Sequence, residues 1–182
     1  MKKMFIVALI CFAHIATAQT GTGFGVKAGL NMSNFTGDDV ESDGATGFYV
    51  GALVDLPITE SFHIQPEVLY SMEGGDESSL SVLRIPIMAK YYVTSGLNIQ
   101  AGPSIGFKVA AEDDFTDEIT KSTDIGLGFG LAYELPIGFF IDLRYTLGLS
   151  NIGDEEGLQD WGGTGDEEIK TTNFQIGVGY KF

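Results

Sequence analysis

The sequence predicts an all-β fold, an eight-stranded antiparallel up-and-down β-barrel. Three observations lead to this prediction. Apolar residues recur at every second position in eight successive segments, the connections between the segments alternate between short and long, and no segment has the spacing of an amphipathic helix. Because an even number of strands joined in this way has no helix to cover its edges, closure into a barrel is the simplest way to lose both edges.

The alternating segments span 24–33, 47–56, 62–71, 83–93, 97–108, 124–134, 139–149 and 174–182. In chain order, representative residues of the apolar face are Val26, Val50, Val68, Ile87, Ile99, Phe129, Leu143 and Ile176. The opposite face carries Lys27, Gly51, Glu67, Met88, Gln100, Gly128, Asp142 and Gly177. Short turns are expected at 57–61, 94–96 and 135–138, and longer connections at 36–45, 72–80, 109–122 and 150–171. This alternation predicts short turns at one end of the barrel and long connections at the other.

The distribution of small and bulky residues predicts which face lies inside. Nearly every strand glycine lies on the polar face, where the narrow lumen of an eight-stranded barrel has room only for packed side chains. Strands of about 11 residues, rising about 3.3 Å each and tilted by about 40°, span roughly 28 Å, close to the hydrocarbon thickness of a bilayer. Five tyrosines fall near strand ends on the apolar face, as an interfacial girdle requires: Tyr70, Tyr91, Tyr133, Tyr145 and Tyr180. The predicted fold is therefore a transmembrane β-barrel.

Charges of both signs lie on the predicted inner face. Six are positive (Lys27, Arg84, Lys90, Lys108, Arg144 and Lys181) and five are negative (Asp55, Glu67, Asp124, Glu134 and Asp142). Since an unpaired buried charge is costly, we expect these residues to form a structural ion network. A lumen filled in this way is largely plugged.

Composition excludes several classes of function. The 182 residues carry 25 acidic and 10 basic side chains, a net charge of -15, which argues against a nucleic-acid partner. The aromatic content of 12% argues against a disordered chain. Five acidic residues lie on the inner face and Glu60 lies in a short turn, which leaves 19 for the long connections. We expect these connections to form an acidic surface.

Residues 1–18 are predicted to be a cleaved signal peptide, with the barrel domain occupying 19–182. Lys2 and Lys3 precede an apolar run too short to span a bilayer, and an A-x-A cleavage pattern ends at Ala18. Cleavage removes Cys11, so the exported chain has no thiol chemistry.

Several short patterns resemble a known family when they are taken together in order. They are the segments 25–31, 84–87 with 90–92, 101–103, 142–145 with 147–149, and 179–182. Over 19–182 the chain resembles the outer-membrane β-barrel proteins of Gram-negative bacteria, the porin-family group that includes the OmpX and OmpA barrels. The resemblance implies an outer-membrane location. It also implies that Tyr180 and Phe182 act as an insertion signal for the barrel-insertion machinery.

Two acidic patterns suggest metal binding, but neither predicts a metal site. The segment 39–44 imitates the start of an EF-hand loop, yet Val50 occupies the twelfth position, where a bidentate Glu is needed. The acidic residues of 112–114, 154–156, 160 and 166–168 form either a loose site for divalent cations or a solvated, mutually repelling surface. No metal and no cofactor are predicted.

His63 shares the predicted inner face with Glu67 and Ser71, which suggests a hydrolase triad. Residues four apart on one strand are about 13 Å apart, so His63 and Glu67 are not expected to touch. A partner for His63 would have to come from another strand, such as Asp55 or Ser104. The alternative is a structural histidine.

We therefore expect a non-enzymatic, monomeric integral outer-membrane barrel with a structural or surface-interaction role. Its expected partners are outer-membrane lipid, lipopolysaccharide and the barrel-insertion machinery, with both termini periplasmic and the acidic connections extracellular. Three alternatives remain open at this point: a small passive diffusion pore, a hydrolase of envelope lipid, and a soluble periplasmic barrel.

Overall fold

The computed structural model describes residues 21–37, 40–41, 45–75, 78–111, 123–150 and 170–182. Three sequence predictions concern residues that lie wholly or mostly outside these ranges: the signal peptide at 1–18, the EF-hand-like segment at 39–44, of which only 40–41 are described, and the acidic residues of 112–114, 154–156, 160 and 166–168. No helix in the described ranges is long and apolar enough to cross a membrane.

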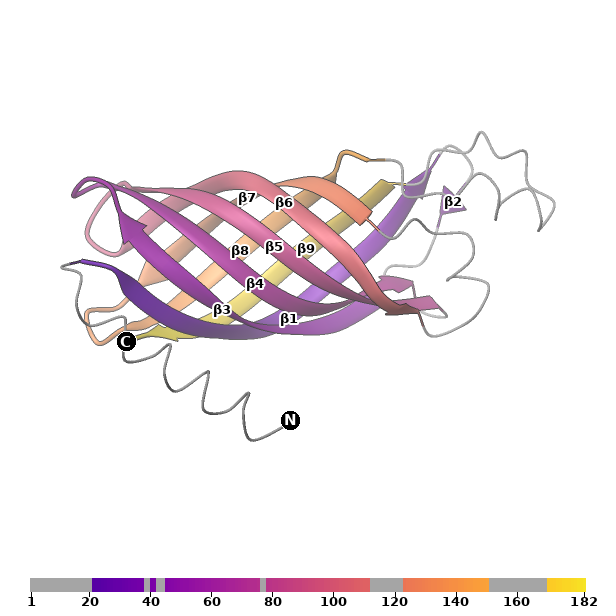
Figure 1. The fold of residues 1–182 in the computed structure, drawn as a ribbon, viewed down its shortest axis with the longest axis horizontal. Helices are drawn as coiled ribbons and strands as arrows, with labels where there is room; N and C mark the ends of the chain where they lie inside the picture. The colour runs from indigo at the N-terminus through magenta and orange to yellow at the C-terminus, as the bar shows by residue number, and fades with distance from the viewer. Residues whose placement is uncertain (1–20, 38–39, 42–44, 76–77, 112–122, 151–169) are drawn as a thin grey trace.

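The described residues form one antiparallel sheet that closes on itself (Figure 1). Its strands are β1 (Gly23–Gly37), β2 (Val40–Glu41), β3 (Ala45–Pro57), β4 (Phe62–Gly75), β5 (Ser78–Tyr92), β6 (Leu97–Ala111), β7 (Thr123–Glu134), β8 (Phe139–Gly148) and β9 (Lys170–Lys181). Each long strand pairs with the next, and β9 pairs with β1 from Gly25↔Lys181 to Thr36↔Lys170. The short β2 pairs only with the end of β1. In the described residues, eight strands therefore form the wall, which confirms the predicted up-and-down barrel.

The wall confirms the predicted sidedness. Alternate residues of β8 change from exposed to buried along the whole strand, with Leu143 outside and Arg144 inside. In the described residues, 19 polar or charged side chains are buried, against seven hydrophobic ones. The interior is thus polar and the outer wall apolar, the reverse of a water-soluble protein.

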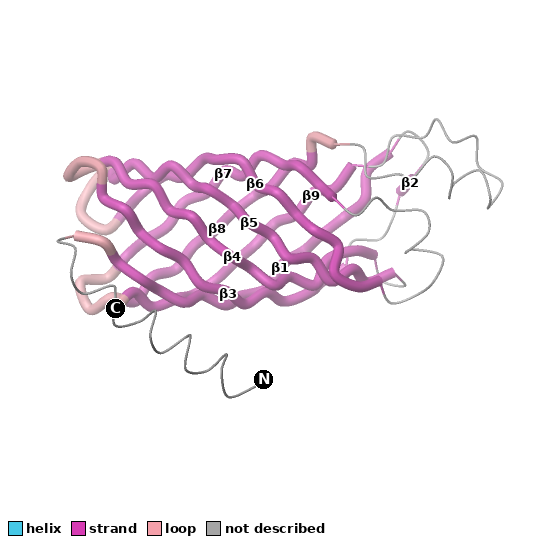
Figure 2. Tube along the Cα trace, viewed as in Figure 1, coloured by secondary structure: helices cyan, strands magenta, loops and turns pink. Residues whose placement is uncertain are grey.

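Three short turns and both described chain ends lie at one end of the barrel, which we call the short-turn end (Figure 2). The turns connect β3 to β4, β5 to β6, and β7 to β8. Gly96 and Gly138 have φ of 82° and 92°, a conformation that favours glycine in tight turns. The opposite end is the long-connection end.

Most strands extend further into the long connections than the sequence predicted, since β1 continues to Gly37, β6 to Ala111, and β9 begins at Lys170, and the largest difference is between β4 and β5. The expected connection 72–80 is mostly strand, because β4 continues to Gly75 and β5 begins at Ser78. This correction matters because it moves Glu73 from a connection to the inner face of β4, where its side chain is 5% exposed. The serines and glycines of the segment suggested a loop, but pairing between β4 and β5 continues through them.

Candidate functional site

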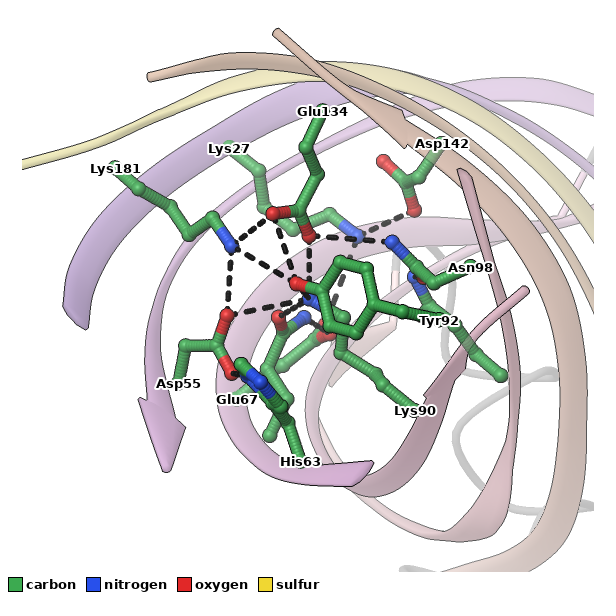
Figure 3. A network of polar contacts seen from close by, with 12 residues as sticks. Lys27, Asp55, His63, Glu67, Lys90, Tyr92, Asn98, Glu134, Asp142 and Lys181 are labelled. Atoms are coloured by element: carbon green, nitrogen blue, oxygen red, sulfur yellow. Dashed lines mark hydrogen bonds and ion pairs between the residues drawn. The ribbon is translucent and has the colours of Figure 1, made fainter. Parts of the chain in front are cut away.

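The lumen is the candidate site, and its short-turn end is crossed by four charged side chains that we call the charge ring (Figure 3). They come from every second strand, β3, β5, β7 and β9, in the order Asp55, Lys90, Glu134 and Lys181. Lys90 Nζ lies 3.3 Å from Asp55 Oδ2 and 2.5 Å from Glu134 Oε1. Lys181 Nζ lies 2.6 Å from Asp55 Oδ2 and also pairs with Glu134. Positive and negative groups therefore alternate around a closed circuit of ion pairs.

Neighbouring side chains complete the hydrogen bonding of the charge ring. His63 Nδ1 lies 2.8 Å from Asp55 Oδ1, and the His63 ring packs against Tyr92 with centroids 4.7 Å apart. Tyr92 and Asn98 donate to Glu134 at 2.9 and 3.2 Å. These contacts hold the carboxylates in place between the lysines, which favours a single arrangement of the ring.

A second group, the central cluster, lies further along the lumen and consists of Lys27, Glu67, Asp142 and Arg144. Arg144 donates two hydrogen bonds to Glu67, from Nη1 at 2.8 Å and from Nη2 at 2.7 Å. Lys27 Nζ lies 2.6 Å from Asp142 Oδ2 and 3.6 Å from Glu67 Oε2. All four side chains are at least 97% buried. A two-point Arg–carboxylate contact is among the strongest polar contacts in proteins, and each partner here would be costly to leave unpaired.

Tyr49 packs beside the central cluster in a space left by two glycines. Its hydroxyl lies 3.5 Å from Asp142 Oδ1, and it is 1% exposed. Gly29 and Gly177 face each other across the β1–β9 pair, and a Cβ at either position would overlap the Tyr49 side chain. These two glycines thus provide room for a large side chain in the lumen, in line with the prediction that the strand glycines face the narrow interior.

A third group, the outer clamp, consists of Glu73, Arg84 and Asp124 and lies toward the long-connection end. Arg84 donates to Glu73 from Nε at 3.0 Å and from Nη2 at 2.6 Å, and to Asp124 from Nη2 at 3.1 Å. Sequence reasoning missed Glu73 because it assigned 72–80 to a connection. The signal that could have found it is its parity, since Glu73 continues the inward row of Glu67, Leu69 and Ser71.

The lumen therefore brings ten of the eleven predicted charges into three groups. The eleventh, Lys108, lies on the inward row of β6 beyond Gly106 and is half-buried. The charge ring and the central cluster are separated by a narrow gap with no room for a water molecule, lined by Lys27, Gln65, Lys90, Gln100, Ala132, Glu134, Phe140 and Asp142.

Of the two contacts that a hydrolase triad needs, carboxylate to histidine and histidine to serine, the described residues show only the first. Asp55 reaches His63, as the sequence allowed, but in the described part of the chain no serine hydroxyl is a hydrogen-bond partner of His63. Ser71 instead accepts a hydrogen bond from Asn31 at 2.6 Å. Within the described ranges, no group of three or more His, Cys, Asp or Glu side chains is arranged to hold a metal ion.

Known proteins share this architecture. Residues 4–182 match the model of the outer membrane protein beta-barrel domain. No curated protein sequence matches the chain. Among solved structures, Ail, the attachment invasion locus protein of Yersinia pestis, in complex with the heparin analogue sucrose octasulfate, is 16% identical and has a TM-score of 0.53. That match covers 88% of this chain and 99% of Ail.

Neisserial surface protein A is 14% identical, with a TM-score of 0.53, and the match covers 87% of this chain and 97% of that one. At these identities the two structures bear on the fold alone. The family model covers nearly the whole chain and confirms the resemblance carried by the strand motifs. The chain belongs to the outer membrane protein beta-barrel domain family and is a protein of the outer membrane.

Proposed function

We propose that the protein is a non-enzymatic barrel that holds an acidic surface at the outside of the membrane, with a lumen closed to flow. The observation that carries the closed lumen is the charge ring, in which Asp55, Lys90, Glu134 and Lys181 contact one another across the opening. An ion moving through it would have to separate several buried ion pairs. The central cluster and the outer clamp are two further barriers of the same kind.

Electrical recording tests this proposal. The full chain, refolded and inserted into planar bilayers, is expected to show no conductance steps above the bilayer background. A shift in gel mobility on boiling provides the control that the inserted material is folded. Conductance steps from folded protein would support the alternative, a small passive diffusion pore, and would contradict the closed lumen.

The orientation we propose places the short-turn end in the periplasm and the long connections outside the cell. Charge asymmetry supports this arrangement. Seven of the 25 acidic residues lie in the wall or in a short turn, and the other 18 lie in or beside the long connections, where Lys121 and Lys170 are the basic residues. Such a surface favours cationic or divalent-cation-bridged contacts, including contacts to lipopolysaccharide phosphates, and repels polyanions. Protease digestion of intact cells is expected to cleave within the long connections and to leave the wall whole.

The acidic surface separates this chain from its structural neighbour in one respect. Ail was crystallised with a heparin analogue, which is a polyanion. With 18 carboxylates at the long-connection end, this chain is expected not to bind sucrose octasulfate at physiological salt. Saturable binding detected by calorimetry would contradict the role we assign to the acidic surface.

The non-enzymatic assignment rests on the surroundings of His63. Its imidazole contacts Asp55 and Tyr92 and supports the charge ring from beside it, which is a structural role. Replacing His63 by Ala is expected to leave the lipid A profile of the envelope unchanged. An altered profile would support the hydrolase alternative.

Insertion and oligomeric state complete the proposal. Tyr180 and Phe182 both project outward at the end of β9, with ring centroids 5.6 Å apart, and Tyr180 packs on Phe139. We propose that these two aromatic residues form the insertion signal and that the barrel is a monomer. Removing Phe182 is expected to lower the yield of inserted barrel in cells while the purified variant still folds in detergent. Light scattering in detergent checks the monomer.

A further inference from the structure

The short-turn end carries exposed apolar side chains where turns in water usually carry polar ones. We call Ile58, Val93, Leu135, Ile137 and Phe182 the turn collar. Ile58, Ile137 and Phe182 are the three most exposed large hydrophobic residues in the described part of the chain, at 61%, 68% and 76%. The lipid-facing wall itself reaches 60%, at Val109 of β6, so these three residues are at least as exposed as the surface that contacts lipid. This apolar surface needs a partner.

The turn collar continues the outward row of the wall. Ile58 follows Leu56 on the outward parity of β3, and Val93 follows Tyr91 on that of β5. The third turn continues the outward row from Tyr133 through Leu135 and Ile137 to Phe139. The collar is thus continuous with the surface that the family places in lipid.

The positions of the opposite parity in the same turns are small or polar. They are Pro57, Thr59, Ser61, Thr94, Gly96, Pro136 and Gly138. On the outward parity itself two turn positions are polar, Ser95 and Glu60, and Glu60 is the one charged side chain in the three turns. The apolar side of the turns therefore continues the wall at the collar residues and is interrupted at Glu60 and Ser95.

Backbone hydrogen bonding in the turns also suits a surface with little water. Ile58 and Thr59 donate to Phe62 O at 2.9 and 3.0 Å, and Leu135 donates to Phe139 O at 2.7 Å. Neighbouring turns are also connected. Glu134 donates to Gly96 O at 2.8 Å, and Lys181 donates to Gly138 O at 2.9 Å. Because an unpaired backbone group is costly in lipid, these bonds allow the turns to enter the edge of the bilayer.

We propose that the turn collar is immersed in the headgroup–acyl boundary of the leaflet at the short-turn end, so that this end presents an apolar rim to lipid rather than a docking surface to a soluble partner. The occupant is phospholipid, because the collar is continuous with the lipid-facing wall and none of its five side chains is charged. The acidic long-connection end is then the face that the protein offers to other molecules. The inference rests on the proposed membrane barrel, and it deepens that proposal by fixing how far the barrel extends from the bilayer.

Single nitroxide labels test the depth of the collar in the full chain, with Cys11 replaced by Ser so that each introduced cysteine is unique. The test positions are Ile58→Cys and Ile137→Cys. Val178→Cys is the reference in the wall, and Glu60→Cys is the matched control in the same turn as Ile58. Labelled protein in phosphatidylcholine–phosphatidylglycerol vesicles is exposed to oxygen, which concentrates in lipid, and to a water-soluble nickel chelate.

Labels at 58 and 137 are expected to collide more with oxygen than with nickel, in a ratio nearer to that at 178 than to that at 60. Nickel-dominated collisions at 58 and 137, with 178 still in lipid, would overturn the collar proposal alone. Nickel access at 178 as well would instead overturn the membrane barrel. Protection of 58 and 137 from both reagents would show coverage by protein, a second copy or another partner, and would also overturn the proposal. If a cysteine variant does not fold, Ile137→Asn and Glu60→Gln provide a second comparison, in which only Ile137→Asn is expected to reduce vesicle insertion.

Discussion

Arg144 and Glu67 are joined by two hydrogen bonds, of 2.8 and 2.7 Å, across the full width of the lumen. Arg144 lies on β8 and Glu67 on β4, and three strands separate β4 from β8 in either direction around the wall. The contact therefore fixes opposite sides of the barrel to each other. Backbone pairing between neighbouring strands cannot do this, because it acts only around the circumference.

Removing one partner of this pair is expected to destabilise the barrel strongly. Arg144→Met leaves Glu67 with Lys27 as its cationic neighbour, and breaking a buried pair of this kind costs about 3–5 kcal/mol. The double variant Glu67→Gln with Arg144→Met is expected to recover part of the loss, with a coupling energy of about 0.5–3 kcal/mol. Urea unfolding in lipid vesicles measures both. Glu60→Gln is the control, since that exposed carboxylate lies in a turn. Strictly additive losses would show that the contact contributes nothing specific.

Substitutions at the charge ring are expected to lower the stability of the barrel by different amounts. Glu134→Gln leaves Lys90 and Lys181 with Asp55 as their shared carboxylate, so a loss of about 3–5 kcal/mol is expected. His63→Gln removes the contact that a partly exposed side chain makes to Asp55 of the charge ring, and the expected loss of stability is about 1 kcal/mol. The temperature at which gel mobility shifts on heating should fall in that order. Equal shifts for the two variants would contradict the closed ring.

Gly177 predicts a steric effect that a second glycine does not share. A Cβ at Gly177 would overlap the Tyr49 hydroxyl and lie 2.8 Å from Asp142 Oδ1. Gly177→Ala is therefore expected to cost about 1–3 kcal/mol. At Gly128 the nearest atom would be Met88 Cε at 3.5 Å, so Gly128→Ala is expected to be tolerated. Adding Tyr49→Phe to Gly177→Ala removes the overlapping oxygen and should restore part of the stability. Absence of any rescue would mean that the Cβ is accommodated elsewhere.

The cost of a charged substitution on the outer wall is expected to depend on its depth in the bilayer. Ile176 lies in the middle of β9, paired with Leu30 and Leu143, and Ile176→Lys is expected to cost about 2–4 kcal/mol in a bilayer. Leu97 begins β6 at the short-turn end, where the same change is expected to cost about 0–1 kcal/mol. Unfolding in vesicles measures the difference. Equal costs at both positions would contradict a wall whose strand centres lie deep in the bilayer and whose short-turn end lies near its surface.

The sequence predicted the strands and their faces well because both follow from a local rule. A residue's parity in an alternating strand decides whether it points to lipid or to the lumen, and this parity is visible without any partner strand. The error at 72–80 has the same origin. Serine and glycine are poor strand formers, so local composition suggested a loop, whereas pairing of β4 with β5 extended both strands and brought the Glu73 side chain within hydrogen-bond distance of Arg84.

The partners within the lumen could not be predicted in the same way. Parity placed Asp55, Lys90 and Glu134 inside, but their mutual contact depends on how far each strand is shifted along its neighbour. For His63 the sequence left two candidate partners on other strands, Asp55 and Ser104, and the position of β4 against β3 decided for Asp55.

By itself, the sequence determined that this chain forms a barrel with an apolar outside and a charged inside, because alternation and composition are properties of single strands. The tertiary structure alone decided that Asp55, Lys90, Glu134 and Lys181 meet in a ring and that Arg144 reaches Glu67. Those contacts depend on the stagger and closure of all the strands together, and every strand contributes to that geometry while none specifies it.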